Sequence, residues 1–200
     1  MIIDFMNILA HLHLASLVSS SLIGNTVADF VKGDPYITYA KDIADGIMLH
    51  RKIDSMTDSL LEVKQAKLLF RQTHRRVASI ALDIVWDHFL SKQWLTFGIM
   101  GTVREFNQYT KQQIQPFITQ YPIDYQNFMQ AMWQGEWLEN YASIDFIEKV
   151  LSGMAKRRPK LFLLKENIID IQQNYSELKA LFAILYPKIS TAVVSSKFIL

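Results

Sequence analysis

The 200-residue chain contains no cysteine. This absence excludes disulfide scaffolds, thiolate zinc sites, iron–sulfur clusters and cysteine nucleophiles. Seven glycines and five prolines are too few for an all-β fold, which needs many tight turns. No glycine-rich phosphate loop, GxSxG elbow or HExxH motif occurs, which disfavours a nucleotide kinase, a serine hydrolase and a zincin protease. The formal net charge of +2 is too small to indicate non-specific binding of nucleic acid.

Charged residues are also missing from one stretch near the amino terminus. Residues 5–28 contain no Lys, Arg, Asp or Glu, a length that could span a bilayer. The stretch nevertheless includes Asn7, His11, His13 and a polar break at residues 19–25, and each of these polar groups would need a partner in lipid. No basic segment precedes it and no cleavage site follows. We therefore expect no membrane span, no signal peptide and a cytoplasmic protein.

Apolar residues make up half of the chain and recur at spacings of three and four almost throughout. Strict alternation is absent, so the pattern predicts an all-α protein. No linker or repeat divides the sequence, and a chain of this length buries roughly 70% of its unfolded surface as one core. We predict a single-domain helical bundle over residues 1–200. The predicted helices are 6–18, 22–32, 41–57, 60–74, 76–94, 102–120, 124–133, 136–153, 160–186 and one after Pro187.

The predicted helix around residues 77–90 carries two acids in an otherwise apolar segment. Asp83 and Asp87 are four residues apart, so they share a face, where like charges repel. Burying unpaired carboxylates costs several kcal/mol each. Something positive must therefore face them. A basic side chain and a metal ion both satisfy this requirement.

A second pair lies in the predicted helix 41–57. Ile43, Ile47, His50 and Asp54 follow one stripe at spacings of four, three and four, which places the two polar residues on the inward track. A lone inward histidine is usually a satisfied core residue, but a histidine–aspartate pair beside two further inward acids is rarer by chance. A site built from imidazole and carboxylate suits Mn²⁺, Mg²⁺ or Fe²⁺ at least as well as Zn²⁺.

Other candidates are left open by spacing alone. Asn25 and Asp29 are four residues apart in the predicted helix 22–32, and a surface amide–acid pair explains them equally well. His11 and His13 are two residues apart, so they project about 200° from one another on a helix. At most one of them reaches a shared site, and the sequence does not say which.

Five segments in order resemble the acyl carrier protein phosphodiesterase family. They are residues 6–15 (MNILAHLHLA), 24–33 (GNTVADFVKG), 49–58 (LHRKIDSMTD), 82–90 (LDIVWDHFL) and 153–159 (GMAKRRP). The likeness runs from about residue 6 to residue 187, so residues 1–5 are interpreted as an alternative start or a non-native remnant.

The resemblance implies an HD-domain-like helical bundle related to the HD phosphohydrolases. It also implies hydrolysis, with a divalent metal, of the bond that joins 4′-phosphopantetheine to the serine of holo acyl carrier protein. Mn²⁺ is the implied ion, with Mg²⁺ or Fe²⁺ as alternatives. The sequence departs from the wider superfamily because it has no His-Asp dipeptide. Asp87-His88 has the reverse order, and His50 with Asp54 is the nearest helical substitute.

The resemblance also implies roles for single residues. Asp87 is either a further ligand or an acceptor that orients a histidine. His11 or His13 protonates the leaving serine oxygen or binds metal, with His13 favoured, and His88 is a further catalytic candidate. The expected metal ligands are Asp29, His50, Asp54, Asp83 and Asp87.

Two basic clusters are candidate docking sites for an acidic acyl carrier protein. An ordinary solvated surface explains each cluster equally well, and nucleic acid is disfavoured because the clusters are short and lack interleaved aromatic residues. An HD-type hydrolase of nucleotides or other small phosphodiesters is the alternative function. A non-catalytic helical module that binds an acidic protein is a second alternative. The clusters are Arg71, Arg75 and Arg76, with His74 among them, and Lys156, Arg157, Arg158 and Lys160.

Overall fold

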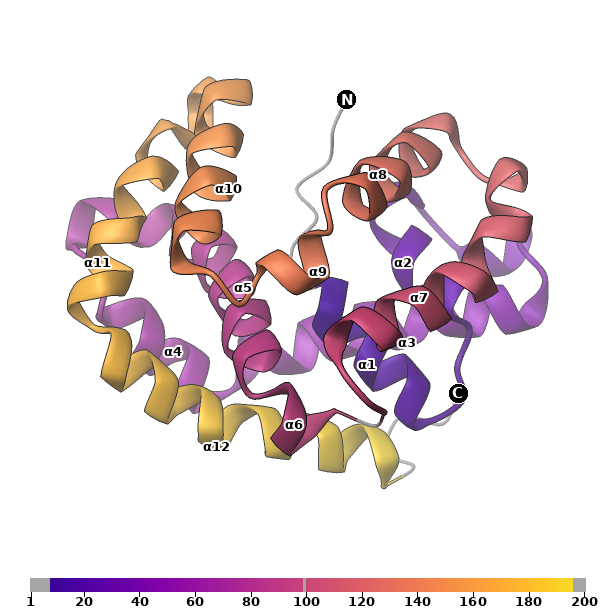
Figure 1. The fold of residues 1–200 in the computed structure, drawn as a ribbon, viewed down its shortest axis with the longest axis horizontal. Coiled ribbons are helices and arrows are strands. Elements are labelled where there is room, and N and C mark those ends of the chain that lie inside the picture. The colour runs from indigo at the N-terminus through magenta and orange to yellow at the C-terminus, as the bar shows by residue number, and fades with distance from the viewer. Residues whose placement is uncertain (1–7, 99, 196–200) are drawn as a thin grey trace.

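The computed structural model describes residues 8–98 and 100–195, and these ranges contain helices and no strand. The predicted all-α class is confirmed (Figure 1). Residues 1–5, predicted to be an alternative start or remnant, lie outside the described residues. The helices are α1 (Ile8–Leu17), α2 (Leu22–Val27), η1 (Ala28–Phe30), η2 (Pro35–Ile37), α3 (Lys41–Ser59), α4 (Leu61–Leu68), η3 (Gln72–His74), α5 (Arg75–Lys92), α6 (Trp94–Phe97), α7 (Val103–Ile114), η4 (Gln115–Gln120), α8 (Ile123–Gln134), α9 (Trp137–Asn140), α10 (Ile144–Arg157), η5 (Pro159–Glu166), α11 (Asn167–Gln173) and α12 (Tyr175–Val194).

Helix α5 is the buried axis of the molecule. It packs against α1, α4, α10 and α12, and Figure 1 shows it passing through the middle of the bundle while α12 runs along one edge. Its residues Ala81, Ile84 and Val85 are fully buried, as the sequence predicts for a helix that is apolar nearly all round. The core cluster includes residues from α1 to α12.

Helices α2 and α3 cross so closely that their backbones touch. A Cβ atom added to Gly24 would lie 2.9 Å from the Cα atom of Gly46, and one added to Gly46 would lie 2.9 Å from the Ser21 carbonyl oxygen. No real side chain tolerates such contacts, so both positions require glycine. The crossing places the segment that follows α2 directly on α3.

A second tie holds that segment in place. Arg51 of α3 donates from Nη1 to the Gly33 carbonyl and from Nη2 to the Val31 carbonyl, each at 2.7 Å. The turn that follows η1 is therefore anchored to the same helix that α2 crosses. This anchoring positions Asp29, which lies in η1.

Several predicted helix boundaries are wrong. The predicted helix 22–32 leaves the α conformation after Val27, and the predicted helix 60–74 ends at Leu68. The predicted helix after Pro187 does not begin there, because Pro187 lies inside α12. Proline removes one backbone donor, and the buried Ile189 and Val193 beyond it keep the helix packed on the core.

No helix among the described residues has the length and apolar character needed to cross a membrane. The uncharged stretch at the amino terminus is divided between α1 and α2, and the polar residues 19–21 separate them. The predicted break is confirmed at residues 19–21, whereas Gly24 and Asn25, which were assigned to it, lie inside α2.

Candidate metal site

Helix α3 supplies two polar side chains to an inward-facing site. His50 and Asp54 are one turn apart, and the His50 Nε2 atom lies 3.1 Å from Asp54 Oδ2. The His50 side chain is 6% exposed, whereas that of Asp54 is 44% exposed. The predicted inward position is confirmed for His50, which is buried, whereas Asp54 is only half-buried and its carboxylate reaches toward solvent.

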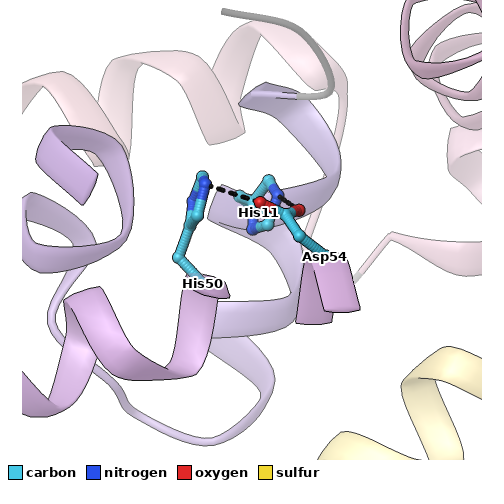
Figure 2. A group of neighbouring side chains, drawn as sticks. All are labelled: His11, His50 and Asp54. Carbon is cyan, nitrogen blue, oxygen red and sulfur yellow. Dashed lines mark hydrogen bonds and ion pairs between the residues drawn. The ribbon is translucent and has the colours of Figure 1, made fainter. Parts of the chain in front are cut away.

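Helix α1 brings a second histidine to the same carboxylate. The His11 Nε2 atom lies 3.0 Å from Asp54 Oδ1. The His11 and His50 rings stack with their centroids 3.7 Å apart and an interplanar angle of 17°. Figure 2 shows that both rings point toward the carboxylate of Asp54, and each carboxylate oxygen contacts the Nε2 atom of one ring.

The 3₁₀ turn η1 adds a fourth side chain. Asp29 Oδ1 lies 3.3 Å from His50 Nε2, and the Asp29 side chain is 32% exposed. Two imidazoles and two carboxylates from three segments of the chain therefore meet, and the carboxylates form the exposed side of the group. We call His11, Asp29, His50 and Asp54 the α1/α3 cluster.

The electrostatics of the cluster follow from these contacts. Burial alone would lower the pKa of His50, but its hydrogen bonds to Asp29 and Asp54 raise that pKa to about 10. Burial would raise the pKa of Asp54, but His11 and His50 hold it well below the usual range. Burial and the neighbouring His50 lower the pKa of His11. The positive charge of the cluster is thus carried by His50, whose Nε2 atom lies beside both carboxylates.

The donor set fits a divalent cation. Ligand atoms of His11, His50 and Asp54 all lie within 4.8 Å of one another. Within the described ranges, no Lys or Arg side chain forms an ion pair with Asp29 or Asp54. Imidazole nitrogen and carboxylate oxygen are ligands of first-row divalent metals, and such a metal would replace the proton on His50.

Asp83 lies beside this cluster without joining it. Its side chain comes from α5 and is partly buried, and its carboxylate is not among the atoms within 4.8 Å of one another. Burial raises its pKa well above the usual value, and the negative charges of Asp54, Asp58 and Asp87 add to that rise. The repulsion expected along α5 is therefore present, and it acts with burial to favour the neutral form of Asp83.

Asp87 closes the start of α1. Its two carboxylate oxygens accept hydrogen bonds from the backbone N–H groups of Leu9 and Ala10, each at 2.9 Å. Helix N-termini leave such groups without intrahelical partners, so Asp87 caps α1 from another helix. Burial raises the pKa of Asp87 to about 7 against the opposing effect of these two donors. The structure thus places Asp87 where it positions α1, and with it His11, and does not place it among the cluster's donors.

His13 and His88 are packed elsewhere. His13 Nδ1 lies 2.7 Å from the Tyr186 hydroxyl oxygen, and burial lowers the pKa of His13 to about 4. His88 Nδ1 lies 2.7 Å from the Tyr141 carbonyl oxygen, and its Nε2 lies 2.8 Å from the Tyr175 hydroxyl oxygen. The structure brings His11 to the cluster in place of the favoured His13, because side chains two residues apart on a helix diverge.

Asn25 has a local role. Its side-chain amide donates to Ser20 Oγ at 3.2 Å and to the Ser21 carbonyl at 3.0 Å. Asn25 is fully buried, which excludes the alternative interpretation of a surface amide–acid pair. The amide stabilises the turn before α2, and Asp29 alone of the pair reaches the cluster.

The first basic cluster is mostly engaged within the protein. Arg75 donates from Nε to the Phe70 carbonyl at 3.1 Å, and the Arg76 guanidinium lies 5.6 Å from the centre of the Phe162 ring. Arg71 Nε donates to Asp170 Oδ1 at 2.7 Å. His74 is buried beside the same carboxylate, so its assignment to a basic surface is wrong. His74 is held inside the fold by Asp170 and Glu166, two acids that lie far along the chain.

The second basic cluster borders a cleft of about 450 Å³. Arg157 and Arg158 line this cleft, and Lys156 and Lys160 are exposed nearby. The sequence analysis missed both the cleft and Lys149, which also lines it. A signal for Lys149 was present, since residues 149, 153 and 157 are spaced by four and share one face of α10.

The chain matches the family model described as acyl carrier protein phosphodiesterase over residues 6–189. A protein of that name from Klebsiella pneumoniae is 48% identical over 183 residues, which cover 92% of this chain and 95% of the relative. One from Yersinia enterocolitica is 47% identical over 182 residues, 91% of this chain and 94% of the relative. No solved structure matches. The chain belongs to the acyl carrier protein phosphodiesterase family.

Proposed function

We propose that this protein hydrolyses the phosphodiester that joins 4′-phosphopantetheine to the serine of acyl carrier protein, with a divalent metal held by the α1/α3 cluster. The names of the relatives supply the substrate and the class of bond. The observation that carries the proposal is the meeting of His11, His50 and Asp54 with Asp29 at a partly exposed site.

The residues that would hold the metal are His11, His50 and Asp54, with Asp29 at the exposed side. A bound divalent ion lowers the pKa of a coordinated water and stabilises negative charge that develops on phosphoryl oxygens. Carboxylate oxygens suit Mg²⁺ and Mn²⁺, whereas imidazole nitrogens suit Fe²⁺ and Zn²⁺. The set of two imidazoles and two carboxylates can hold each of these ions, and Mn²⁺ is the proposed ion because the family resemblance implies it.

Three acidic side chains have separate roles in the proposed reaction. Asp54 accepts from both imidazoles and holds the two rings in one orientation. Asp29 lies on the exposed side, where a substrate phosphate and an attacking water arrive. Asp87, by capping α1, is a positioning residue for His11. An His/Asp pair one turn apart in α3 would then replace the His-Asp dipeptide of an HD-type site.

The basic residues 156–160 are the proposed docking site for the carrier, because acyl carrier proteins are acidic and opposite charge favours encounter. Lys156 and Lys160 are exposed, and Arg157 faces the cleft. This surface remains accessible, unlike Arg71 and Arg75, whose guanidinium groups are engaged within the fold. The cytoplasmic location and the absence of nucleic-acid binding stay predictions.

The direct test is to incubate holo acyl carrier protein with the purified protein and Mn²⁺ and to weigh the carrier by mass spectrometry. We expect the carrier to lose the mass of the phosphopantetheine arm, and we expect His50→Gln to leave it intact. An unmodified carrier together with hydrolysis of bis(4-nitrophenyl) phosphate would assign the site to small phosphodiesters. If neither substrate is hydrolysed and the protein carries no stoichiometric metal, the result would favour a non-catalytic module that binds an acidic protein.

A further inference from the structure

The cleft of about 450 Å³ lies between α8, α9 and α10 and has an aromatic wall. The ring centroids of Phe30 and Phe128 are 5.8 Å apart, and those of Phe128 and Trp137 are 5.7 Å apart. Phe146 continues the wall and lies 5.7 Å from the Tyr141 ring. The volume is within the range of about 300–1,000 Å³ that is typical of small-molecule sites.

Basic side chains outnumber acidic ones in the lining of the cleft. Lys149, Arg157 and Arg158 line it together with one acid, Asp124, and one amide, Asn127. The cationic side chains are hydrogen-bond donors, and the amide can both donate and accept a hydrogen bond. This lining therefore favours a ligand with several acceptor oxygens over a purely hydrocarbon one.

The cleft begins where the α1/α3 cluster ends. Phe30 lines the cleft, and the preceding residue, Asp29, contacts His50 through its carboxylate. Both residues lie in the short turn η1, which Arg51 anchors to α3 through the following carbonyls. The cluster and the cleft are therefore joined through η1, and a ligand that reaches both would have to pass this turn.

We propose that this cleft binds the pantetheine arm of the carrier while the phosphate lies at the α1/α3 cluster. The inference rests on the proposed function and names the part of the substrate that the cleft recognises. Pantetheine bears a dimethyl group and methylenes, which suit the aromatic wall, and amides, which suit Asn127. Its amide carbonyl oxygens can accept hydrogen bonds from the basic residues.

Gly153 provides the means to test the cleft without disturbing the fold. It lines the cleft from α10, and a Cβ atom added there would meet only the Arg157 Nη1 atom, at 3.3 Å. That atom ends a flexible side chain, so the remaining space is open. Gly153→Leu would therefore occupy the cleft, and removing a glycine from a helix interior favours the helix.

The test uses the full-length protein without metal and titrates it calorimetrically with pantetheine, which has no phosphate. We expect pantetheine to bind the wild-type protein and to bind Gly153→Leu at least ~10-fold more weakly, because a buried leucine side chain excludes the ligand. The matched control is Ser152→Leu, which adds similar bulk one residue away and outside the cleft lining. It should bind pantetheine like the wild type.

Kinetics with the Mn²⁺-loaded protein supply a second readout. Gly153→Leu should raise KM for holo carrier about 10-fold, because ground-state binding of the arm is lost. Asn127→Leu, which removes only the amide, should raise KM less. Thermal unfolding with and without Mn²⁺ checks that each variant folds and still binds metal.

The outcomes separate this inference from the proposed function. Wild-type protein that binds pantetheine but does not cleave holo carrier would overturn the function and keep the cleft assignment. Wild-type protein that cleaves the carrier while wild type and Gly153→Leu show equal pantetheine titrations and equal KM would overturn the cleft assignment alone. Absence of pantetheine binding to the wild-type protein would also overturn it.

Discussion

The protein contains two clusters of histidine and carboxylate side chains that differ in whether an arginine takes part. In the α1/α3 cluster, His11 and His50 contact Asp54, and His50 also contacts Asp29. In the second cluster, His74 Nδ1 lies 2.8 Å from Asp170 Oδ2 and its Nε2 lies 3.4 Å from Glu166 Oε2. The second cluster differs because Arg71 Nε donates to Asp170 at 2.7 Å.

The difference lies in where the positive charge comes from. Arg71 keeps its charge at every pH of interest, so the acids beside His74 have a permanent partner, and the cluster joins the segment before α5 to α11. The α1/α3 cluster has no such partner among the described residues and depends on a removable proton on His50. Two carboxylates that have no Lys or Arg partner can bind a metal ion from solution.

The largest effect is expected from Asp54→Asn, which removes the carboxylate that links both imidazoles. Turnover of holo carrier should fall by ~10³-fold or more, since ligand loss removes the metal with its transition-state stabilisation. Elemental analysis should show metal in the wild-type protein and none in the variant. A variant that keeps both metal and turnover would place the ion elsewhere.

Asp170→Asn is the matched change in the other cluster. It leaves Arg71 and the buried His74 without their shared carboxylate, and because Arg71 is 45% exposed the cost should be about 1–3 kcal/mol. The midpoint of urea unfolding should fall accordingly, while metal content stays at the wild-type level. An unchanged midpoint would mean that this network is not a structural clamp.

Metal itself should stabilise the fold only through the α1/α3 cluster. At a free Mn²⁺ concentration of 100 times Kd, the free energy of unfolding should rise by about 2.7 kcal/mol. For a chain of this length, that gain raises Tm by roughly 5–10 °C. Differential scanning calorimetry should show the shift in the wild type and in Asp170→Asn but not in His50→Gln. Equal shifts in all three proteins would contradict the assignment.

His88 offers the smallest test, because it is a buried histidine with no carboxylate partner among the described residues. Burial lowers its pKa below the ordinary value of 6.5, so the unfolded chain takes up a proton that the folded protein excludes. The stabilisation is complete above pH 6.5 and is lost as the pH falls below it, with a slope of at most ~1.4 kcal/mol per pH unit from this residue. His88→Gln should reduce the slope between pH 6.5 and 5 in chemical denaturation by this share, while His11 and His13, whose pKa values are also lowered, maintain the rest. A wild-type slope in the variant would assign the acid sensitivity to other groups.

The sequence predicted what depends on one helix. The period of α3 was sufficient to place His50 and Asp54 on a common inward stripe, and the apolar composition of α5 predicted its burial. These properties need only the 3.6-residue repeat.

What the sequence did not reveal depends on contacts between distant segments. Asp87 caps α1 across 77 and 78 residues of sequence, so its role is invisible in the spacing of its own helix. His74 meets Asp170 across 96 residues, which turned an expected surface residue into a buried one. The choice between His11 and His13 likewise required the relative rotation of α1 and α3.

The close contact between Gly24 of α2 and Gly46 of α3 affects the geometry of the proposed metal site. Gly24 and Gly46 let the two backbones approach to the limit of steric contact, and η1 follows directly after α2, so their separation fixes the gap between Asp29 and His50. Metal–ligand distances tolerate only about 0.2 Å. A methyl group at either glycine would force the two helices apart, and we expect this change, although remote from the cluster, to widen the gap between Asp29 and His50.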